Sequence, residues 1–214
     1  MTSEARESQT AAVRLAASWL LWYPDDVLLA RLPDIRAVAG QLPTRYADPL
    51  LAFVAYLDAT PISEVQTHYV ATFDMKRKAC PYLTYWTDGD TRNRGRAILR
   101  FKQAYLESGF DIGSAELPDH LAVVLEFAAV GDTLTGNALL AEHSVPIHLL
   151  RDALAKLESA YAFVLDVIVA TLPSRTPEIE VRMAELAASG PPAEMVGLEP
   201  FGVSVTIESI GARR

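Results

Sequence analysis

The sequence predicts an all-α protein: a single compact, helical bundle-like domain of about eight to ten helices. Apolar residues recur at helical spacing along most of the chain, and Pro, Gly and capping residues separate these runs. The 214 residues are enough for one domain with a sizeable core, and half of them are hydrophobic. We expect residues 1–190 to form the helical domain and residues 191–214 to form an extended or mobile tail.

In the first half of the chain, apolar stripes and stop signals predict four helices before a basic segment. The expected helices cover about residues 12–22, 25–32, 46–57 and 62–73, with Thr60 capping the fourth. The basic segment, residues 75–96, is interpreted as a long loop with a short helical turn. A further helix over about 94–108 should end at Gly109.

In the second half, the run from Glu116 to Leu121 predicts a helix with Pro118 in its first turn and Gly131 at its end. Another helix is expected over 133–143. A wide apolar stripe predicts that the longest and central helix starts at Ser144 and reaches residue 172. Thr176 should cap the last helix.

Composition and charge limit the class of protein. The net charge of −8 argues against a general nucleic-acid binder and suits a positively charged partner. A single cysteine, Cys80, excludes an internal disulfide and fits a reducing cytoplasm. The N-terminal pattern is unlike a signal peptide, and the longest apolar run contains Asp166, so neither export nor an integral membrane segment is expected.

Few side chains carry an obvious chemistry. The four histidines show no metal-binding spacing, so no metal site and no cofactor are predicted. The Cys80 thiol has basic neighbours that favour a lowered pKa, but no base accompanies it, so a semi-buried thiol in a loop is the favoured interpretation. Asp119 and His120 are adjacent at a helix start, where they either cap the helix, act as an acid/base couple or recognise a basic amphipathic peptide.

Two other groups of residues allow both a functional and a structural interpretation. Tyr69 and Phe73, four residues apart, belong either to the core or to the floor of a groove. In the basic segment, Arg92 and Arg94 are suited to contact phosphate or an acidic partner, although a solvated helix start is equally consistent with the pattern.

Several motifs occur along the chain in the order that one known family shows. They lie in residues 20–26, 69–74, 83–86, 89–92, 94–95, 116–121, 125–127 and 158–162. The most specific are the Leu-Pro-Asp-His and Gly-Asp-Thr-Arg runs. With these motifs the chain resembles the delta-subunit, or NarJ-type, assembly chaperones of respiratory nitrate reductase, within the helical maturation chaperones of molybdenum redox enzymes. Ala122 departs from the pattern, because many members carry a second proline after the Leu-Pro-Asp-His-Leu run.

The resemblance implies a cytoplasmic binding protein that is not an enzyme. Such chaperones bind the N-terminal segment of the apo catalytic (alpha) subunit of nitrate reductase and enable molybdenum cofactor insertion. On this interpretation the peptide-binding residues are Tyr69, Phe73, Asp74, Leu117, Pro118, Asp119, His120 and Glu126, with Asp119 and His120 at the polar rim of a groove. Arg92 and Arg94 would contact the partner or cofactor.

Two alternatives are also consistent with the same residues. One is a small helical hydrolase or transferase that uses Asp119 and His120. The other is a carrier of molybdopterin cofactor that binds through the basic segment.

Overall fold

The computed structural model describes residues 2–113 and 116–192, and this part of the chain contains eleven α-helices. The predicted tail lies almost wholly outside the described residues. The all-α prediction is confirmed, and the only pairing of strand type among the described residues is an isolated antiparallel bridge between Tyr82 and His120. The helices are α1 Ser3–Leu20, α2 Asp26–Ala39, α3 Thr44–Ala59, α4 Ile62–Tyr69, α5 Leu83–Asp88, α6 Arg92–Glu107, α7 Leu121–Val130, α8 Thr133–Glu142, α9 Ser144–Lys156, α10 Tyr161–Val169 and α11 Pro177–Ser189.

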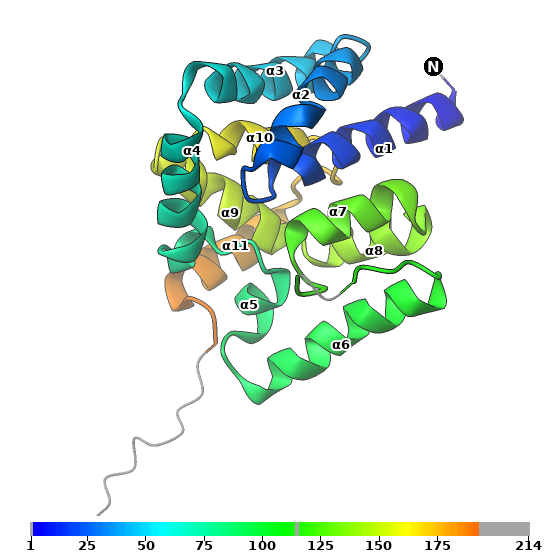
Figure 1. Cartoon of the computed structure of the whole chain (residues 1–214). Helices are drawn as coiled ribbons and strands as arrows, with labels where there is room; N and C mark the ends of the chain where they lie inside the picture. Colours follow the sequence, from blue (N-terminus) through cyan, green and yellow to red (C-terminus); the bar gives the residue numbers. More distant parts are fainter. Residues whose placement is uncertain (1, 114–115, 193–214) are drawn as a thin grey trace, which may run out of the picture.

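Two packed groups of helices form the core. α1 lies along α7, and α7 packs against α8, while α10 packs against α3 and α9 (Figure 1). α10 also contacts α1, so the two groups share one hydrophobic cluster. α6 lies along the edge of the molecule, outside α7 and α8 (Figure 1).

Side-chain caps explain where several helices begin. The Asp25 carboxylate accepts a hydrogen bond of 2.9 Å from the Leu28 backbone N–H at the start of α2. Thr91, Asp132 and Thr176 cap α6, α8 and α11 in the same manner. These contacts satisfy backbone N–H groups that have no partner inside the helix. The predicted cap at Thr60 is wrong, because α4 starts after Pro61 without a side-chain cap.

The predicted central helix from residue 144 to residue 172 is two helices. α9 ends at Lys156, and Glu158 adopts a left-handed conformation with φ of 52°. The Ser159 hydroxyl then accepts a hydrogen bond from the Tyr161 N–H at the start of α10. The apolar stripe continues across the break because both helices bury the same side of the chain, so periodicity alone did not reveal the interruption.

Two other boundaries differ from the prediction. α2 continues through Pro33 to Ala39, because Ile35 and Ala39 extend its buried face. The basic segment contains a 3-10 turn, Arg77–Ala79, the short helix α5 and the first residues of α6. The short helical turn predicted here is present as α5, but α5 is too short for a periodic signal to indicate its bounds.

The close approach of α7 and α8 depends on Gly136. A Cβ atom at this position would lie 2.5 Å from the Cα of Ala128 on α7, closer than packed atoms tolerate. Only glycine therefore allows this spacing of the two helices.

We expect Gly136→Ala to lower the free energy of unfolding by about 1–3 kcal/mol, because the added methyl group forces α7 and α8 apart. The matched control is Gly95→Ala on exposed α6, where nothing lies within 4 Å of the new Cβ. This control should instead stabilise the protein by about 0.5–1 kcal/mol. Urea unfolding of both variants tests the pair, and equal effects would contradict the packing argument.

Candidate functional site

The Leu-Pro-Asp-His run is held in place by backbone pairing with the segment that precedes α5. The Leu83 N–H donates to the Asp119 carbonyl and the Leu121 N–H donates to the Pro81 carbonyl, each at 3.0 Å. Pro118 is buried, and its carbonyl accepts a 2.7 Å hydrogen bond from the Tyr105 hydroxyl. The Leu-Pro-Asp-His run was predicted to form the first turn of a helix. It instead forms a short non-helical segment, the strap, across the N-terminal end of α7.

Asp119 is fully buried beneath this strap. One oxygen of its carboxylate, Oδ2, accepts hydrogen bonds from the Thr84 hydroxyl at 2.6 Å and from the Thr84 N–H at 3.2 Å. The prediction that Asp119 lies at an exposed rim is wrong. Its carboxylate joins α5 to the start of α7, and it is unavailable to solvent.

His120 is also buried, with 2% of its surface exposed, and it is the N-cap of α7. Its Nδ1 accepts a hydrogen bond from the Ala122 N–H, which places the ring proton of the neutral imidazole on Nε2. The ring stacks on Trp22, with centroids 5.5 Å apart. Burial lowers the pKa of His120, although Glu116 and Asp119 act in the opposite direction. The predicted position of His120 at an exposed groove rim is therefore wrong too.

Tyr69 and Phe73 are core residues. Both side chains are buried, and their rings lie 5.8 Å and 4.8 Å, respectively, from the ring of Tyr161 on α10. Phe73 belongs to a π-helical turn, Val70–Asp74, which follows α4. The interpretation of these two aromatics as an open groove floor is wrong, because helix α10 covers them.

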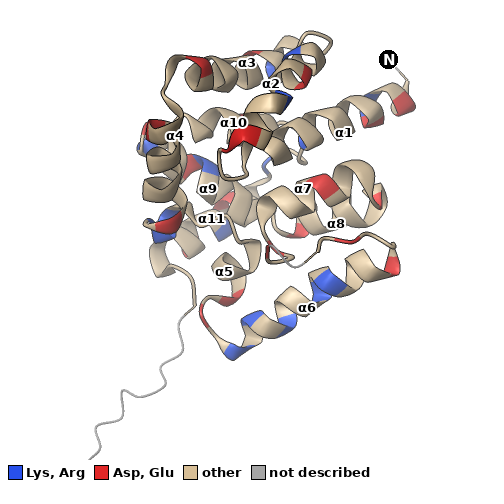
Figure 2. Ribbon diagram, viewed as in Figure 1, with Lys and Arg blue, Asp and Glu red and all other residues tan. Residues whose placement is uncertain are grey.

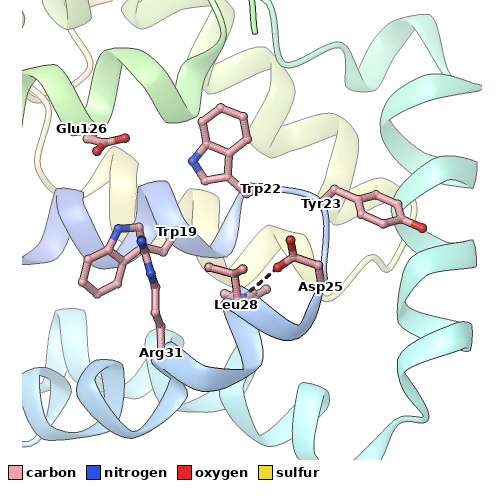
Figure 3. Close-up of a pocket in the computed structure, with 8 residues that line it drawn as sticks. Trp19, Trp22, Tyr23, Asp25, Leu28, Arg31 and Glu126 are labelled. Atoms are coloured by element: carbon pink, nitrogen blue, oxygen red, sulfur yellow. Dashed lines mark hydrogen bonds between the residues drawn. The ribbon is translucent and has the colours of Figure 1, made fainter. Parts of the chain in front are cut away.

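An open pocket borders Trp22, the residue on which the buried His120 stacks. It has a volume of about 320 Å³ and lies between α1, α2 and α7. Trp19 forms one wall and carries the Arg31 guanidinium 4.5 Å above its ring, while Glu126 approaches from α7 (Figure 3). The lining residues are Trp19, Trp22, Tyr23, Asp25, Val27, Leu28, Arg31 and Glu126.

The buried candidate residues Tyr69 and His120 pack against aromatic side chains that line this pocket. Tyr69 meets Tyr23 edge-to-face at 5.4 Å, and its hydroxyl donates to the Leu21 carbonyl at 3.2 Å. His120 stacks on Trp22. The predicted residues therefore hold the aromatic side chains of the loop between α1 and α2, which the sequence interpretation had treated as a helix end. The signal for these residues was present in the matching stretch 20–26.

The remaining candidates do not gather on one surface. Asp74 and Leu117 are exposed, and of the predicted peptide-binding residues Glu126 alone lines the pocket. Arg94 is half-buried and faces inward, where its guanidinium lies 5.7 Å from the Tyr82 ring and 5.8 Å from the Tyr85 ring. Arg92 is exposed at the start of α6.

Cys80 is a partly buried free thiol, as the favoured interpretation of the sequence expected. Burial raises the pKa of the thiol to about 11, so the nearby cations do not produce a reactive thiolate. Among residues 2–113 and 116–192, no group of three or more His, Cys, Asp or Glu side chains is placed to hold a metal ion. No described helix is long and apolar enough to cross a membrane.

A solved structure shares this arrangement of helices. A crystal structure described as a redox enzyme maturation protein from Archaeoglobus fulgidus superposes with a TM-score of 0.55 and 22% identity, covering 75% of this chain and 91% of that one. This likeness establishes the fold. The family model for the nitrate reductase delta subunit matches residues 39–165, and the chain belongs to that family.

Three relatives agree with this assignment. NarJ of Bacillus subtilis is 35% identical over 158 residues, which cover 73% of this chain and 86% of the relative. NarJ of Escherichia coli, a nitrate reductase molybdenum cofactor assembly chaperone, is 30% identical over 71% of this chain and 66% of its own length. The nitrate reductase-like protein NarX of Mycobacterium tuberculosis is 40% identical over 72% of this chain, but the match spans only 23% of NarX.

We expect Asp119→Ala to lower the free energy of unfolding by about 1.5–3 kcal/mol, because it leaves two buried Thr84 donors without their charged acceptor. Asp74→Ala is the control, since Asp74 is an exposed carboxylate, and its effect should stay within about 0.5 kcal/mol. Denaturant unfolding measures both. An exposed role for Asp119 predicts a small effect for both variants.

Stability should decrease as the pH falls below about 6.5, the ordinary pKa of histidine. The pKa of His120 is lowered in the folded protein, so the unfolded chain takes up the proton first and acid favours unfolding. His120→Asn keeps a helix-capping side chain and removes the titration. We expect a flatter slope of unfolding free energy against pH between 7 and about 5 for this variant.

Part of the slope should survive in that variant. Burial also lowers the pKa of His68, and it lowers the pKa of His148 to about 4. An unchanged slope in His120→Asn would show that His120 does not contribute to the pH dependence.

Proposed function

We propose that this chain is a system-specific assembly chaperone for a nitrate reductase. In this proposal it binds the N-terminal segment of the apo catalytic subunit in the cytoplasm and enables insertion of the molybdenum cofactor. Residues 1–190 act as the chaperone domain, and the chain itself is not a catalyst. Membership of the delta subunit family and the description of the Escherichia coli relative support the proposal.

The observation that carries the proposal is the aromatic pocket between α1, α2 and α7 (Figure 3). Trp19 and Trp22 are only half-buried, so they offer apolar surface to a partner. Amphipathic side chains of this kind anchor peptide complexes because they bury a large area at little entropic cost. An apolar side chain of the peptide fits between the two indoles.

Charges around the pocket favour a basic peptide. Asp25 and Glu126 bring two carboxylates to its edge, and the chain as a whole carries a net charge of −8. Arg31 stacks on Trp19, so its positive charge lies over the indole face. Glu126 can pair with a cationic side chain of the bound segment, and neighbouring side chains of that segment can cover Trp22.

The enzymatic alternative fits the structure less well. A general acid or base must reach the proton that it transfers. Asp119 is fully buried and bonded to Thr84, and the Nδ1 of His120 is occupied by the cap of α7. Both side chains therefore bond to other parts of the protein, whereas a hydrolase or transferase would need them to contact its substrate.

A binding titration with a matched pair of apolar variants tests the pocket. Val27 lines it with 59% of its surface exposed, and Val181 on α11 is 58% exposed away from it. We expect Val27→Ser to weaken binding of a synthetic N-terminal peptide of the catalytic subunit about five- to tenfold, through lost apolar contact. Val181→Ser should leave the dissociation constant unchanged in calorimetry.

A second matched pair tests the charge. Glu126→Gln should weaken the basic peptide about two- to fivefold and reduce the salt dependence of binding. Glu180→Gln makes the same change on α11 and should have no effect. Absence of heat at every temperature, or equal effects of the pocket and control variants, would refute the proposed site.

A further inference from the structure

Helix α6 differs in charge from the rest of the molecule. Its 16 residues contain five cations and one acid, whereas the whole chain carries a net charge of −8. The cationic bands of α6 lie along one outer edge of the molecule (Figure 2). A basic surface on an otherwise acidic protein favours binding of an acidic partner at this edge and disfavours its binding at most other parts of the surface.

The exposed face of α6 has a regular pattern. At 100° per residue, the buried Phe101 and Tyr105 lie on the face opposite Leu99 and Leu106. Leu99 and Leu106 are 60% and 63% exposed, although both are large apolar residues. The outward stripe has alternating spacings of four and three residues, the seam spacing of a coiled coil, and consists of Arg92, Arg96, Leu99, Gln103 and Leu106.

Cations flank the two leucines. Arg100 lies on one side of the stripe and Lys102 on the other, and both are exposed. Arg100 forms an ion pair of 3.1 Å with Glu142, in which the two side chains are 68% and 48% exposed. A hollow of about 470 Å³ runs along this face, lined by Arg96, Leu99, Arg100, Lys102, Gln103 and Leu106.

We propose that this face of α6 is a second docking surface, which binds an acidic amphipathic helix of a partner protein. The partner helix places apolar side chains at heptad spacing against Leu99 and Leu106. Its flanking carboxylates pair with Arg100 and Lys102, as flanking charges do across a two-stranded coiled coil. The surface is made by α6 alone, whereas the aromatic pocket belongs to α1, α2 and α7, so the two sites are separate.

The pattern favours a protein helix over a lipid surface. A helix that inserts into a membrane interface presents a broad apolar face. Here Gln103 lies between the two leucines on the stripe, and its amide already donates a 2.8 Å hydrogen bond to Glu107. An acidic partner helix can hydrogen-bond to Gln103, whereas the acyl region of a bilayer cannot.

The test uses the full chain and a fluorescent three-heptad peptide with leucine at the seam and glutamate at the flanking positions. A scrambled peptide of the same composition breaks the heptad spacing and serves as the control ligand. We expect the heptad peptide to bind in fluorescence anisotropy, the scrambled peptide to bind at least about tenfold more weakly, and added salt to weaken binding.

Two pairs of exposed variants locate the contact. Leu99→Ser should weaken the heptad peptide about fivefold or more, whereas Leu134→Ser, at a residue 81% exposed on α8, should not. Lys102→Gln should weaken it about two- to fivefold, whereas Lys156→Gln on α9 should not. Thermal unfolding confirms that the variants are folded.

Three results would overturn the proposal. These are no binding of the heptad peptide up to about 200 µM, equal binding of the scrambled peptide, and equal effects of the α6 and control variants. Sedimentation with phosphatidylglycerol vesicles, without peptide binding, would assign the face to a lipid surface instead. None of these outcomes depends on the aromatic pocket, so each proposed site stands or fails separately.

Discussion

The buried pairing of Asp119 with Thr84 is the interaction on which the rest of the site depends. Burial removes water from the Asp119 carboxylate, and the hydroxyl and N–H of Thr84 replace part of that hydration through two hydrogen bonds to Oδ2, while Oδ1 has no partner among the described residues. This pairing holds α5 against the N-terminal end of α7. It also fixes the strap that makes His120 the cap of α7 and places its ring behind Trp22.

The site therefore has two layers with different tasks. The inner layer of Tyr69, Asp119 and His120 is buried and takes part in packing, capping and hydrogen bonding, although the Oδ1 of Asp119 has no hydrogen-bond partner among the described residues. The outer layer, which includes Trp22 and Glu126, borders the open pocket. A rigid inner layer keeps the outer aromatic side chains in position before any ligand arrives, so less conformational entropy is lost on binding.

The helical fold was largely predictable, because apolar periodicity and capping residues are local signals. The break at Glu158 was not, since the same face of the chain stays buried on both sides of it. For the site, the sequence identified the motif residues but did not indicate how deeply each of them is buried. Whether Phe73 or Asp119 faces solvent is decided by α10 and α5, which are distant in sequence or too short to be recognised. Trp19 and Trp22 were missed as binding residues because their helical spacing indicated only that they belong to the first helix.

The shallow anchoring of α6 has a consequence for how the molecule opens. Only Phe101 and Tyr105 of its 16 residues are buried, whereas α7 buries seven of its ten. Regions with few buried contacts unfold locally at a lower free energy than the whole domain. Backbone amide protons of α6 therefore exchange with solvent ahead of those of α7, and this outer helix can detach while the remaining core stays folded.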